Sequence, residues 1–344
     1  MKNIALIYGG EGRERDISRA SAKSLYELID KDKYRVIPVF ISKEGNWYIS
    51  ESSPFSSLPT KLAHPTFPIR LHGVSGLLSN EKILKIDCAI PILHGDFGED
   101  GIIQGVLRAT HIPFIGADVC ESAICIDKIY TKYIARATGI ATADFLVGEG
   151  RQMRDILAVE KEVMDTLGFP VFIKPARLGS SIGAMAVRNE DEFLSKYAKT
   201  LSFGSRVLIE KLIDVDYEIE CALFSKGDEK FFSSGIIKTC GKVYDFDEKY
   251  TKNNIETSVA EESSDAILQA EEYARQISHA IGLSSISRID FLVDRSGKIY
   301  FNEINTMPGM TKASLYPRLT EAMGFKRGEF LSQLISEVLC DGDI

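Results

Sequence analysis

The chain has 344 residues, of which 44% are hydrophobic and 26% are charged, and its formal net charge is −8. A chain of this length can bury a large core and is expected to divide into two or three domains. The acidic balance, without a strongly basic block, argues against nucleic acid as the main partner. No apolar run reaches the roughly 18–20 residues of a membrane span, so no membrane contact is expected.

The N-terminal segment and the cysteines indicate the cellular compartment. The apolar run in MKNIALIYGG leads directly into a glycine turn, which is typical of a first buried strand and not of a signal peptide. Six cysteines are scattered without a CxxC pair, at positions 88, 120, 125, 221, 240 and 340. Such cysteines indicate reduced thiols, so we expect a cytoplasmic protein.

The first third of the chain alternates apolar runs with glycine loops. The runs over 3–8, 35–41 and 86–93 predict buried strands, and helices are expected from about Ile17 and from about Gly101. One narrow apolar face is predicted for the first helix, made of Ile17, Ala20, Ser21, Ser24, Leu25 and Leu28. Strand–loop–helix units imply a parallel sheet that binds ligands at the carboxyl ends of its strands.

Two further features complete this part. Residues 50–78 are rich in Ser, Pro and His and predict an irregular segment. A domain boundary is expected near Gly116, after which residues 119–138 predict a helix.

The remainder of the chain is richer in strands. VFIKPA and AMAVRN predict two strands around the glycine loop RLGSSIG, and RVLIEKLI, YEIECALF and EKFFSSGIIK predict three more. The polar segment 241–263 predicts a long loop, a candidate lid. Residues 264–281 predict a helix with Ile267, Ala270, Ala274, Ile277 and Ile281 inward, and two helices are expected over 311–324 and 326–339.

A β-hairpin is predicted in SISRIDFLVDRSGKIYFNEIN, with its turn at 294–297. A turn centred in this range places Arg288 opposite Glu303 and Asp290 opposite Phe301. Because side chains alternate along a strand, one face then carries Arg288, Asp290, Glu303 and Asn305.

The acidic face of this hairpin suggests a metal site. Two carboxylates and an amide oxygen can converge on Mg²⁺, which prefers oxygen ligands completed by water and phosphates. The alternative is a solvated hairpin face with a cross-strand Arg–Glu pair. The turn-rich TMPGMTKASLYP that follows opens a helix beside this face, which favours a phosphate site.

Other charged residues stand at the ends of predicted strands. Lys174 ends a strand five residues before the loop 179–183, whose backbone N–H groups can bind phosphate. The lysine precedes the glycines, so this is not the GxxxxGK[ST] phosphate loop; a flexible hairpin loop is the alternative. Lys128, Glu210 and Glu218 are ordinary surface or strand-edge residues if each is taken alone.

The two N-terminal glycine loops also carry charged groups. Glu14 lies between two arginines in the first loop, and His94 and Glu99 lie in the second. A single histidine after a strand is more often structural. Glycine loops at strand ends are, however, where an α/β sheet places small charged ligands.

Eight motifs occur in order over nearly the whole chain: YGGEGRERDIS, ILHGDFGEDGIIQG, CIDKIYTK, FIKPARLGSSIG, VLIEKLI, YDFDEKY, SRIDF and NEINTMPGMTKASLYP. Together they resemble the D-alanine–D-alanine ligases of the ATP-grasp superfamily. The resemblance implies an α/β fold with an N-terminal parallel-sheet domain and two ATP-grasp subdomains with antiparallel sheets. We place these at residues 1–116, 117–211 and 212–344.

By position, the resemblance implies a nucleotide and metal site. Residues assigned to ATP are Lys128, Lys174, Ser181, Glu210, Glu218 and Lys249. The lysines are implied to contact phosphates, Glu210 to lie near the adenine amino group and Glu218 on the ribose. Magnesium, expected as two ions with manganese as a substitute, is assigned to Asp290, Glu303 and Asn305.

The remaining assignments concern the amino-acid substrates. Catalytic residues are implied to be Glu14, Ser180, Tyr250, Arg288 and Gly309. Glu14 is implied to bind the first ammonium and to form a hydrogen-bonded group with Ser180 and Tyr250. Arg288 and the Gly309 N–H are implied to bind the oxyanion. Substrate contacts are assigned to His94, Glu99, Ser314 and Leu315, the last as an apolar wall that favours D-alanine over D-serine.

The implied activity is ATP-dependent joining of two D-alanines through a D-alanyl phosphate, for peptidoglycan precursors, by a homodimer. One alternative is a ligase that uses D-serine or D-lactate as the second substrate, as in glycopeptide resistance. A protein that binds nucleotide without catalysis is the alternative from another class.

Overall fold

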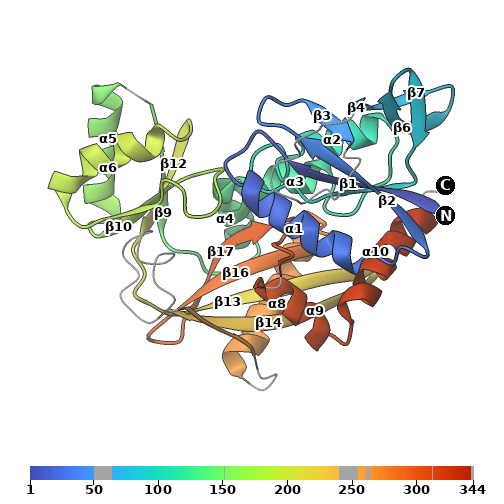
Figure 1. Cartoon of the computed structure of the whole chain (residues 1–344). Helices are drawn as coiled ribbons and strands as arrows, with labels where there is room; N and C mark the ends of the chain where they lie inside the picture. Colours follow the sequence, from blue (N-terminus) through green and yellow to red (C-terminus); the bar gives the residue numbers. More distant parts are fainter. Residues whose placement is uncertain (50–63, 151, 240–254, 261–263, 312, 342–344) are drawn as a thin grey trace.

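The computed structural model describes residues 1–49, 64–150, 152–239, 255–260, 264–311 and 313–341. Three large sheets form the frame: an N-terminal sheet, a central sheet and a C-terminal sheet, joined around helix α4 (Figure 1). The predicted α/β class, with one sheet containing parallel strands and two antiparallel sheets, is confirmed.

The N-terminal sheet has the order β4-β3-β2-β1-β8. Its strands are β4 (His64–Pro65), β3 (Trp47–Ile49), β2 (Tyr34–Ile41), β1 (Lys2–Gly9) and β8 (Cys88–Pro91). The apolar strand β1 pairs in parallel with β2 and β8 and is buried from Ile4 onward. Helix α2 (Ile102–Ala109) begins as predicted, just after Gly101.

Part of the segment predicted to be irregular is regular, so the prediction for 50–78 is wrong over residues 64–78. A small antiparallel sheet forms there from β5 (Phe67–Leu71), β6 (Val74–Ser79) and β7 (Lys82–Lys85). Its strands alternate weakly and are half exposed, which explains why periodicity did not reveal them.

Helix α1 (Arg15–Leu28) buries a face that matches the predicted one only in part, at Ser21 and Leu25. Ser18 and Ala22 are buried, whereas Ile17 is 43% exposed and Ala20 is exposed. Ser18 is buried because its hydroxyl accepts from the Gly9 N–H at 2.9 Å and donates to a carbonyl at the end of β8. Hydrogen bonding, and not hydrophobicity, therefore decides which face of this helix points inward.

The single helix predicted over 119–138 is two helices, so that prediction is wrong. Helix α3 (Val119–Ile126) ends at Asp127, whose backbone is extended, and α4 (Lys128–Ala137) begins after it. The Asp127 carboxylate accepts from the Ile129 N–H at 3.1 Å and so caps α4. This break sets the direction of α4, which carries Lys128 at its first position.

The central sheet is antiparallel throughout, in the order β11-β10-β12-β9. Its strands are β9 (Phe145–Glu149), β10 (Val171–Pro175), β11 (Met185–Val187) and β12 (Arg206–Lys211). Helices α5 (Met153–Thr166) and α6 (Glu190–Leu201) pack together on its outer face (Figure 1). The predicted glycine loop joins β10 to β11.

The C-terminal sheet has the order β15-β14-β13-β16-β17. Its strands are β13 (Val215–Lys226), β14 (Glu229–Thr239), β15 (Ile255–Val259), β16 (Ile286–Asp294) and β17 (Ile299–Asn305). Helix α8 (Asp265–Ile281) buries all five predicted inward residues against one face. Helices α9 (Leu315–Ala322) and α10 (Arg327–Asp341) pack on the other face, between this sheet and the N-terminal sheet.

The segment 241–263 was predicted to be a loop throughout, and β15 shows that this is wrong for residues 255–259. Residues 240–254 and 261–263 lie outside the described part of the chain. The predicted Lys249 and Tyr250 fall there.

The predicted hairpin forms, but its register differs from the predicted one. Asp290 pairs with Glu303 and Arg288 with Asn305, and Asn302 is the extra residue of a β-bulge. The turn is also longer than predicted, since the last pair is Val293 with Ile299. The four predicted residues still share one face, and Asp290 and Glu303 are direct neighbours and not diagonal ones.

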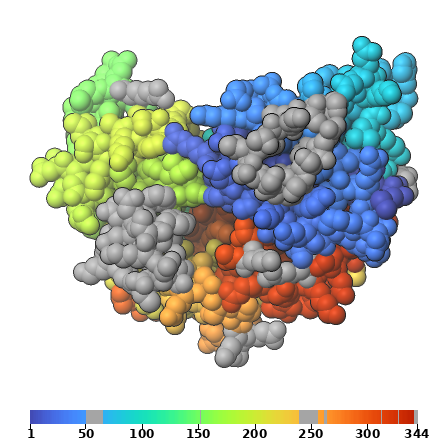
Figure 2. All heavy atoms as spheres, viewed as in Figure 1, coloured from blue at the N-terminus to red at the C-terminus, as the bar shows by residue number. Residues whose placement is uncertain are grey.

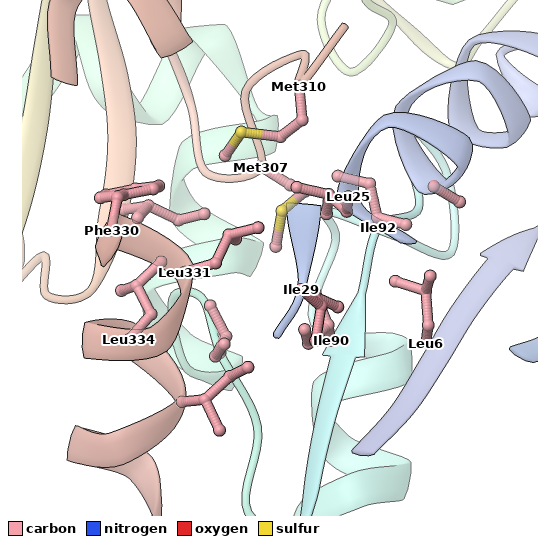
Figure 3. Close-up of a cluster of buried hydrophobic side chains, with 14 of the residues drawn as sticks. Leu6, Leu25, Ile29, Ile90, Ile92, Met307, Met310, Phe330, Leu331 and Leu334 are labelled. Carbon is pink, nitrogen blue, oxygen red and sulfur yellow. The ribbon is translucent and has the colours of Figure 1, made fainter. Parts of the chain in front are cut away.

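A hydrophobic cluster connects the N-terminal sheet to the C-terminal helices (Figure 3). Leu6, Ile90 and Leu25 approach from β1, β8 and α1, while Phe330 and Leu334 approach from α10. Met307 and Met310, in the loop that follows β17, lie between the two groups and are 4% and 5% exposed. The loop 306–310 is therefore anchored in the core.

The cysteines outside the masked segment, at positions 88, 120, 125, 221 and 340, are free thiols, as predicted. Burial raises the pKa of Cys88, Cys125 and Cys221. Within the described ranges, no helix has the length and apolarity needed to cross a membrane.

Candidate active site

A cavity of about 1040 Å³ lies where the three sheets meet. In Figure 2 the C-terminal sheet is seen recessed between the central part and the N-terminal part. Every predicted site residue in the described part of the chain lines this cavity, except Leu315. The structure therefore brings together side chains that the sequence distributes over about 300 positions.

The acidic face of the β16–β17 hairpin forms the floor. Arg288 donates to both carboxylate oxygens of Asp290, at 2.8 and 2.7 Å, and the Asn305 amide donates to the same carboxylate at 3.0 Å. Glu303 pairs with the Lys128 ammonium at 3.1 Å. The floor thus alternates acidic and basic groups, each held by a neighbour.

The pKa values of the two floor carboxylates are shifted in opposite directions. Burial raises the pKa of Asp290, although Arg288 opposes this. Burial also disfavours the charged form of Glu303, but the positive charges of Lys128 and Lys174 outweigh it and lower its pKa to about 2. Glu303 therefore stays ionised at neutral pH.

The donor set of this face fits a magnesium ion. Asp290 and Glu303 lie directly opposite on adjacent strands and offer carboxylate oxygens, and Asn305 adds an amide oxygen on the same face. Within the described ranges, no group of three His, Cys, Asp or Glu side chains could hold a metal by itself. Mg²⁺ sites of this kind use one or two carboxylates and take further oxygens from substrate phosphates and water.

The bulge adds a residue that the sequence analysis missed. Because Asn302 is the inserted residue, it lies on the cavity side together with Glu303. Its amide oxygen accepts from the Lys174 ammonium at 3.0 Å. A bulge leaves no mark in an alternating pattern, so neither Asn302 nor the pairing of Asp290 with Glu303 could be predicted from it.

Lys174 and Glu210 lie on adjacent strands of the central sheet, β10 and β12, and form an ion pair at 2.8 Å. Lys132, from α4, approaches the other oxygen of Glu210 at 2.6 Å. Burial opposes ionisation of Glu210, but the two lysines outweigh it and lower its pKa to about 2. Lys132 was not predicted as a site residue, although it follows Lys128 by four residues on one helix face.

Strand β13 contributes another wall of the cavity. Glu218 lines the cavity as predicted, and so does Glu220, which was not predicted. Glu220 stands opposite Asp290 and approaches the Arg288 guanidinium at 3.4 Å. Its position two residues after Glu218 on the same strand face was a readable signal.

Three loops converge on Glu14. Ser180 donates a short hydrogen bond to its carboxylate, and a Cβ atom at Gly95 or Gly179 would lie only 2.3 or 3.2 Å from that carboxylate. Ser180 and Ser181 both have positive φ, which is uncommon for residues with side chains and typical of functional loops. Burial raises the pKa of Glu14, with a smaller opposing effect from Ser180.

His94 and Glu99 line the cavity, as predicted for substrate contacts, and they also bind the backbone of Met307. Glu99 accepts from the Met307 N–H at 3.0 Å, and the His94 Nδ1 lies 3.0 Å from the Met307 carbonyl. A carbonyl only accepts, so Nδ1 carries the proton, and Nε2 accepts from Ser21, whose oxygen in turn accepts from the Met310 N–H. Burial lowers the pKa of His94 and raises that of Glu99.

Of the two residues predicted at the start of α9, one lines the cavity and the other is buried in the core. Ser314 lines the cavity beside Gly309, where a Cβ atom would lie 2.9 Å from the Ser314 hydroxyl oxygen. Leu315 is 6% exposed and packs in the core, so closely that a Cβ at Gly235 would lie 2.6 Å from it. Leu315 therefore forms no wall of the cavity, and the predicted reason for preferring D-alanine over D-serine does not hold.

The arrangement supports chemistry on an anionic ligand. Lys128, Lys174 and Arg288 present cationic groups to the cavity, which suits phosphates. Glu14 presents to the same cavity a carboxylate that suits an ammonium group. The loop 306–310 is held at the Met307 backbone and contributes Gly309 to the lining of the cavity.

Comparisons with known proteins cover almost the whole chain. The family model described as D-ala D-ala ligase N-terminus matches residues 3–117, and the one described as D-ala D-ala ligase C-terminus matches 134–336. A D-alanine–D-alanine ligase of a Thermoanaerobacter species is 35% identical over 97% of this chain and 96% of its own length.

Solved structures share the architecture. The VanG D-Ala:D-Ser ligase of Enterococcus faecalis has a TM-score of 0.86 at 31% identity and covers 98% of this chain and 99% of its own. A D-alanine–D-alanine ligase of Bacillus anthracis complexed with ATP has a TM-score of 0.73 at 26% identity, over 100% of this chain and 99% of its own.

Proposed function

The chain belongs to the D-alanine–D-alanine ligase family, and from this membership we propose that it joins two D-alanines while converting ATP to ADP and phosphate. The product is the dipeptide used for peptidoglycan precursors. The observation that carries the proposal is the convergence on one cavity of the Glu14 carboxylate, the cationic Lys128 and Lys174, and the paired carboxylates of Asp290 and Glu303.

In this proposal, the phosphates of ATP bind to Lys128 and Lys174. Within the described residues Lys174 donates to Glu210 and Asn302, and Lys128 donates to Leu178 and pairs with Glu303, so each ammonium keeps one of its three donors for a phosphate. The adenine amino group is placed at Glu210, whose oxygens can accept further hydrogen bonds, and the ribose at Glu218. Ser181 is placed near the phosphates and Lys249 at the γ-phosphate.

Asp290, Glu303 and Asn305 would hold magnesium. When bound, the metal supplies charge neutralisation for the transferring phosphoryl group. The expectation of two ions, with manganese as a substitute, rests on the family resemblance.

In the first step, a carboxylate oxygen of the first D-alanine attacks the γ-phosphorus, and the bond to ADP breaks to give D-alanyl phosphate. Glu14 holds the ammonium of this substrate, with Ser180 and Tyr250 in its hydrogen-bonded group. Positioning of this kind supplies much of the rate in phosphoryl transfer.

In the second step, the amine of the second D-alanine attacks the acyl carbon. The amide bond forms, the bond to phosphate breaks, and the amine passes a proton to the departing phosphate. Arg288 and the Gly309 N–H stabilise the tetrahedral oxyanion. Acyl phosphates hydrolyse in water, so the reaction requires a closed site, and the 241–263 segment is the predicted lid.

D-Alanine is the proposed second substrate because curated relatives that match over nearly their full length are D-alanine–D-alanine ligases. Likeness to a D-Ala:D-Ser ligase structure makes D-serine the specific alternative. Hydrophobic pockets discriminate against an added hydroxyl by only about a hundredfold.

The test is a screen of D-amino and D-hydroxy acids as second substrate, with phosphate release measured and products identified by mass spectrometry. D-Alanyl-D-alanine should form fastest at equal concentrations. Faster formation of D-alanyl-D-serine would establish the alternative, and ATP binding without D-alanine-dependent phosphate release would establish a non-catalytic nucleotide-binding protein.

Three further expectations belong to this proposal. The domain boundaries are proposed at 1–116, 117–211 and 212–344, which the grouping of strands into separate sheets supports. A cytoplasmic location follows from the scattered cysteines, and a homodimer follows from the resemblance alone.

A further inference from the structure

Lys132 is a buried cation that the proposed reaction does not use. It lies on α4 one turn after Lys128, its side chain is 1% exposed, and it is not among the residues that line the cavity. Its ammonium pairs with Glu210 at 2.6 Å and donates to the Phe301 carbonyl of β17 at 3.1 Å. Lys132 therefore lies behind the site, between the central and C-terminal sheets.

The partner of Lys132 is shared with a residue of the cavity. One oxygen of Glu210 faces Lys132, and the other pairs with Lys174 at 2.8 Å. Lys174 also donates to Asn302 at 3.0 Å and lines the cavity. The row Lys132–Glu210–Lys174 thus runs from the interior to the place where phosphates are proposed to bind.

The stability of the fold does not explain why a charged residue is buried at position 132. Removing an ammonium group from water is costly, and a buried ion pair is often no more stabilising than packed apolar side chains of the same volume. Burial lowers the pKa of Lys132 to about 8, so it still carries its charge at neutral pH. Lys128 does not provide the second charge on Glu210, because it pairs with Glu303.

We propose that Lys132 is a positioning residue for the nucleotide: by sharing Glu210 with Lys174, it keeps a net positive charge on the Lys174 side of the cavity. Two ammonium groups share one carboxylate, so the row carries one net positive charge. Without Lys132, Glu210 would neutralise Lys174 completely and hold it away from a phosphate. The inference rests on the proposed binding of ATP.

The primary test is Lys132→Met, which removes the charge and keeps a long apolar side chain. Isothermal titration of the full chain with MgATP and with adenosine separates the two parts of the nucleotide. MgATP affinity should fall about tenfold, the scale of one lost charge contact in a partly buried site. Adenosine affinity should change much less, and KM for ATP should rise while KM for D-alanine stays constant.

The double variant Lys132→Met/Glu210→Gln supplies the decisive comparison. Glutamine keeps an oxygen that can accept from adenine but no longer neutralises Lys174, so the double variant should recover most of the lost MgATP affinity. A purely structural role for Lys132 predicts the opposite, because each change would add to the damage. If Lys132→Met alone does not fold, the double variant is compared directly with the unchanged chain, and wild-type affinity for MgATP supports the proposal.

Lys196→Met is the matched control. Lys196 also pairs with a glutamate, Glu192 at 2.9 Å, and donates to a backbone carbonyl, but it lies on α6 outside the cavity. Equal loss of adenosine and MgATP affinity in Lys132→Met, or no loss of either, would overturn the inference. Failure of the unchanged chain to bind MgATP would instead overturn the proposed function.

Discussion

Glu303 is the residue on which the metal assignment depends most directly. It is ionised, with its pKa lowered to about 2, and it lies opposite Asp290 on the cavity floor. Glu303→Gln keeps the shape and removes the charge, so turnover at saturating ATP should fall by about a hundredfold or more while the fold is kept. The measurement is D-alanine-dependent phosphate release over a magnesium titration, with circular dichroism to check folding.

Glu149→Gln is the control for this change. Glu149 also pairs with a cationic side chain, that of Arg206 at 2.8 Å, but it is exposed and lies outside the cavity, on β9. It should leave turnover unchanged. Near-normal activity of Glu303→Gln at ordinary magnesium concentrations would show that the metal binds elsewhere.

Glu14 gives a prediction about pH. Burial raises its pKa above the ordinary 4.5, and the hydrogen bond from Ser180 partly opposes this. The proposed ammonium contact needs the ionised form, so kcat/KM for D-alanine should be lost on acidification at a pH above 4.5. Ser180→Ala removes a bond that lowers the pKa, and the acid limb should therefore move to still higher pH.

The pH profile separates this effect from general damage. Ser195→Ala changes an exposed serine of α6 and should alter neither the rate nor the pH of the acid limb. If Ser180→Ala reduces the rate equally at every pH, or moves the limb to lower pH, Glu14 is not the group that titrates.

At the scale of single residues, the sequence revealed those that stand in recognisable motifs. The alternation of β16 and β17 correctly placed Arg288 and Asp290 on one face, because a strand has a strict period of two. Asn302 and Lys132 were missed for physical reasons. Asn302 faces the cavity because of a bulge. Lys132 pairs with the carboxylate of Glu210, which lies 78 positions away in the chain and is close to it only in the folded structure.

Among the larger elements, the loop 306–310 is the one most clearly held in place. Met307 and Met310 anchor it in the core, and Glu99 and His94 bind the Met307 N–H and carbonyl. This leaves Gly309 on the cavity surface, where its N–H is proposed to stabilise the oxyanion. We therefore expect Glu99 to act on the reaction through the backbone of the loop.

Glu99→Gln tests this role. One of its oxygens accepts from Met307 and the other from the Gly95 N–H at 2.8 Å, and an amide NH₂ would face one of these donors. We expect kcat to fall about tenfold, roughly the effect of one lost hydrogen bond, with KM for ATP unchanged. Hydrogen exchange at 306–310 should become faster.

The control is Glu192→Gln, because Glu192 also accepts from a backbone N–H, that of Arg188 at 3.0 Å, outside the cavity. It should affect neither kcat nor exchange in the loop. A change in KM for ATP alone, with normal kcat, would assign Glu99 to the nucleotide and not to the loop.

Element predictions succeeded where periodicity was strong and failed where local hydrogen bonding decided the outcome. Helix α8 buries each predicted residue because its apolar positions recur at helical spacing. The break at Asp127 and the buried face of α1 depend on caps and on serine bonds, which carry little weight in a hydrophobic pattern. Strand β15 depends on pairing with β14, so its polar sequence gave no signal.

In the whole molecule, the cavity is a meeting point that no single element forms. The N-terminal sheet contributes its loops, the central sheet contributes Lys174 and Glu210, and the C-terminal sheet contributes Asp290 and Glu303. Ordered motifs and the family resemblance predicted this convergence correctly. The ion pairs across it could not be predicted, because they depend on side-chain positions between sheets.

These ion pairs lead to a prediction about ligand binding by the whole molecule. Arg288 binds both oxygens of Asp290, and Lys128 pairs with Glu303 at 3.1 Å, so the carboxylates proposed for magnesium are bound to cations in this structure. Magnesium alone has to displace these cations without offering them a new partner. ATP offers them phosphates, and the carboxylates then become available to the metal.

Magnesium and ATP should therefore stabilise the protein together by more than the sum of their separate effects. Ligand present at about 100 times its Kd raises the free energy of unfolding by about 2.7 kcal/mol, which corresponds to several degrees in Tm for a chain of this size. Differential scanning calorimetry with magnesium alone, ATP in EDTA, and both should show a small, an intermediate and a large increase in Tm. If magnesium alone raised Tm as much as MgATP does, the carboxylates would not be held by Arg288 and Lys128, and the proposed exchange of partners would be wrong.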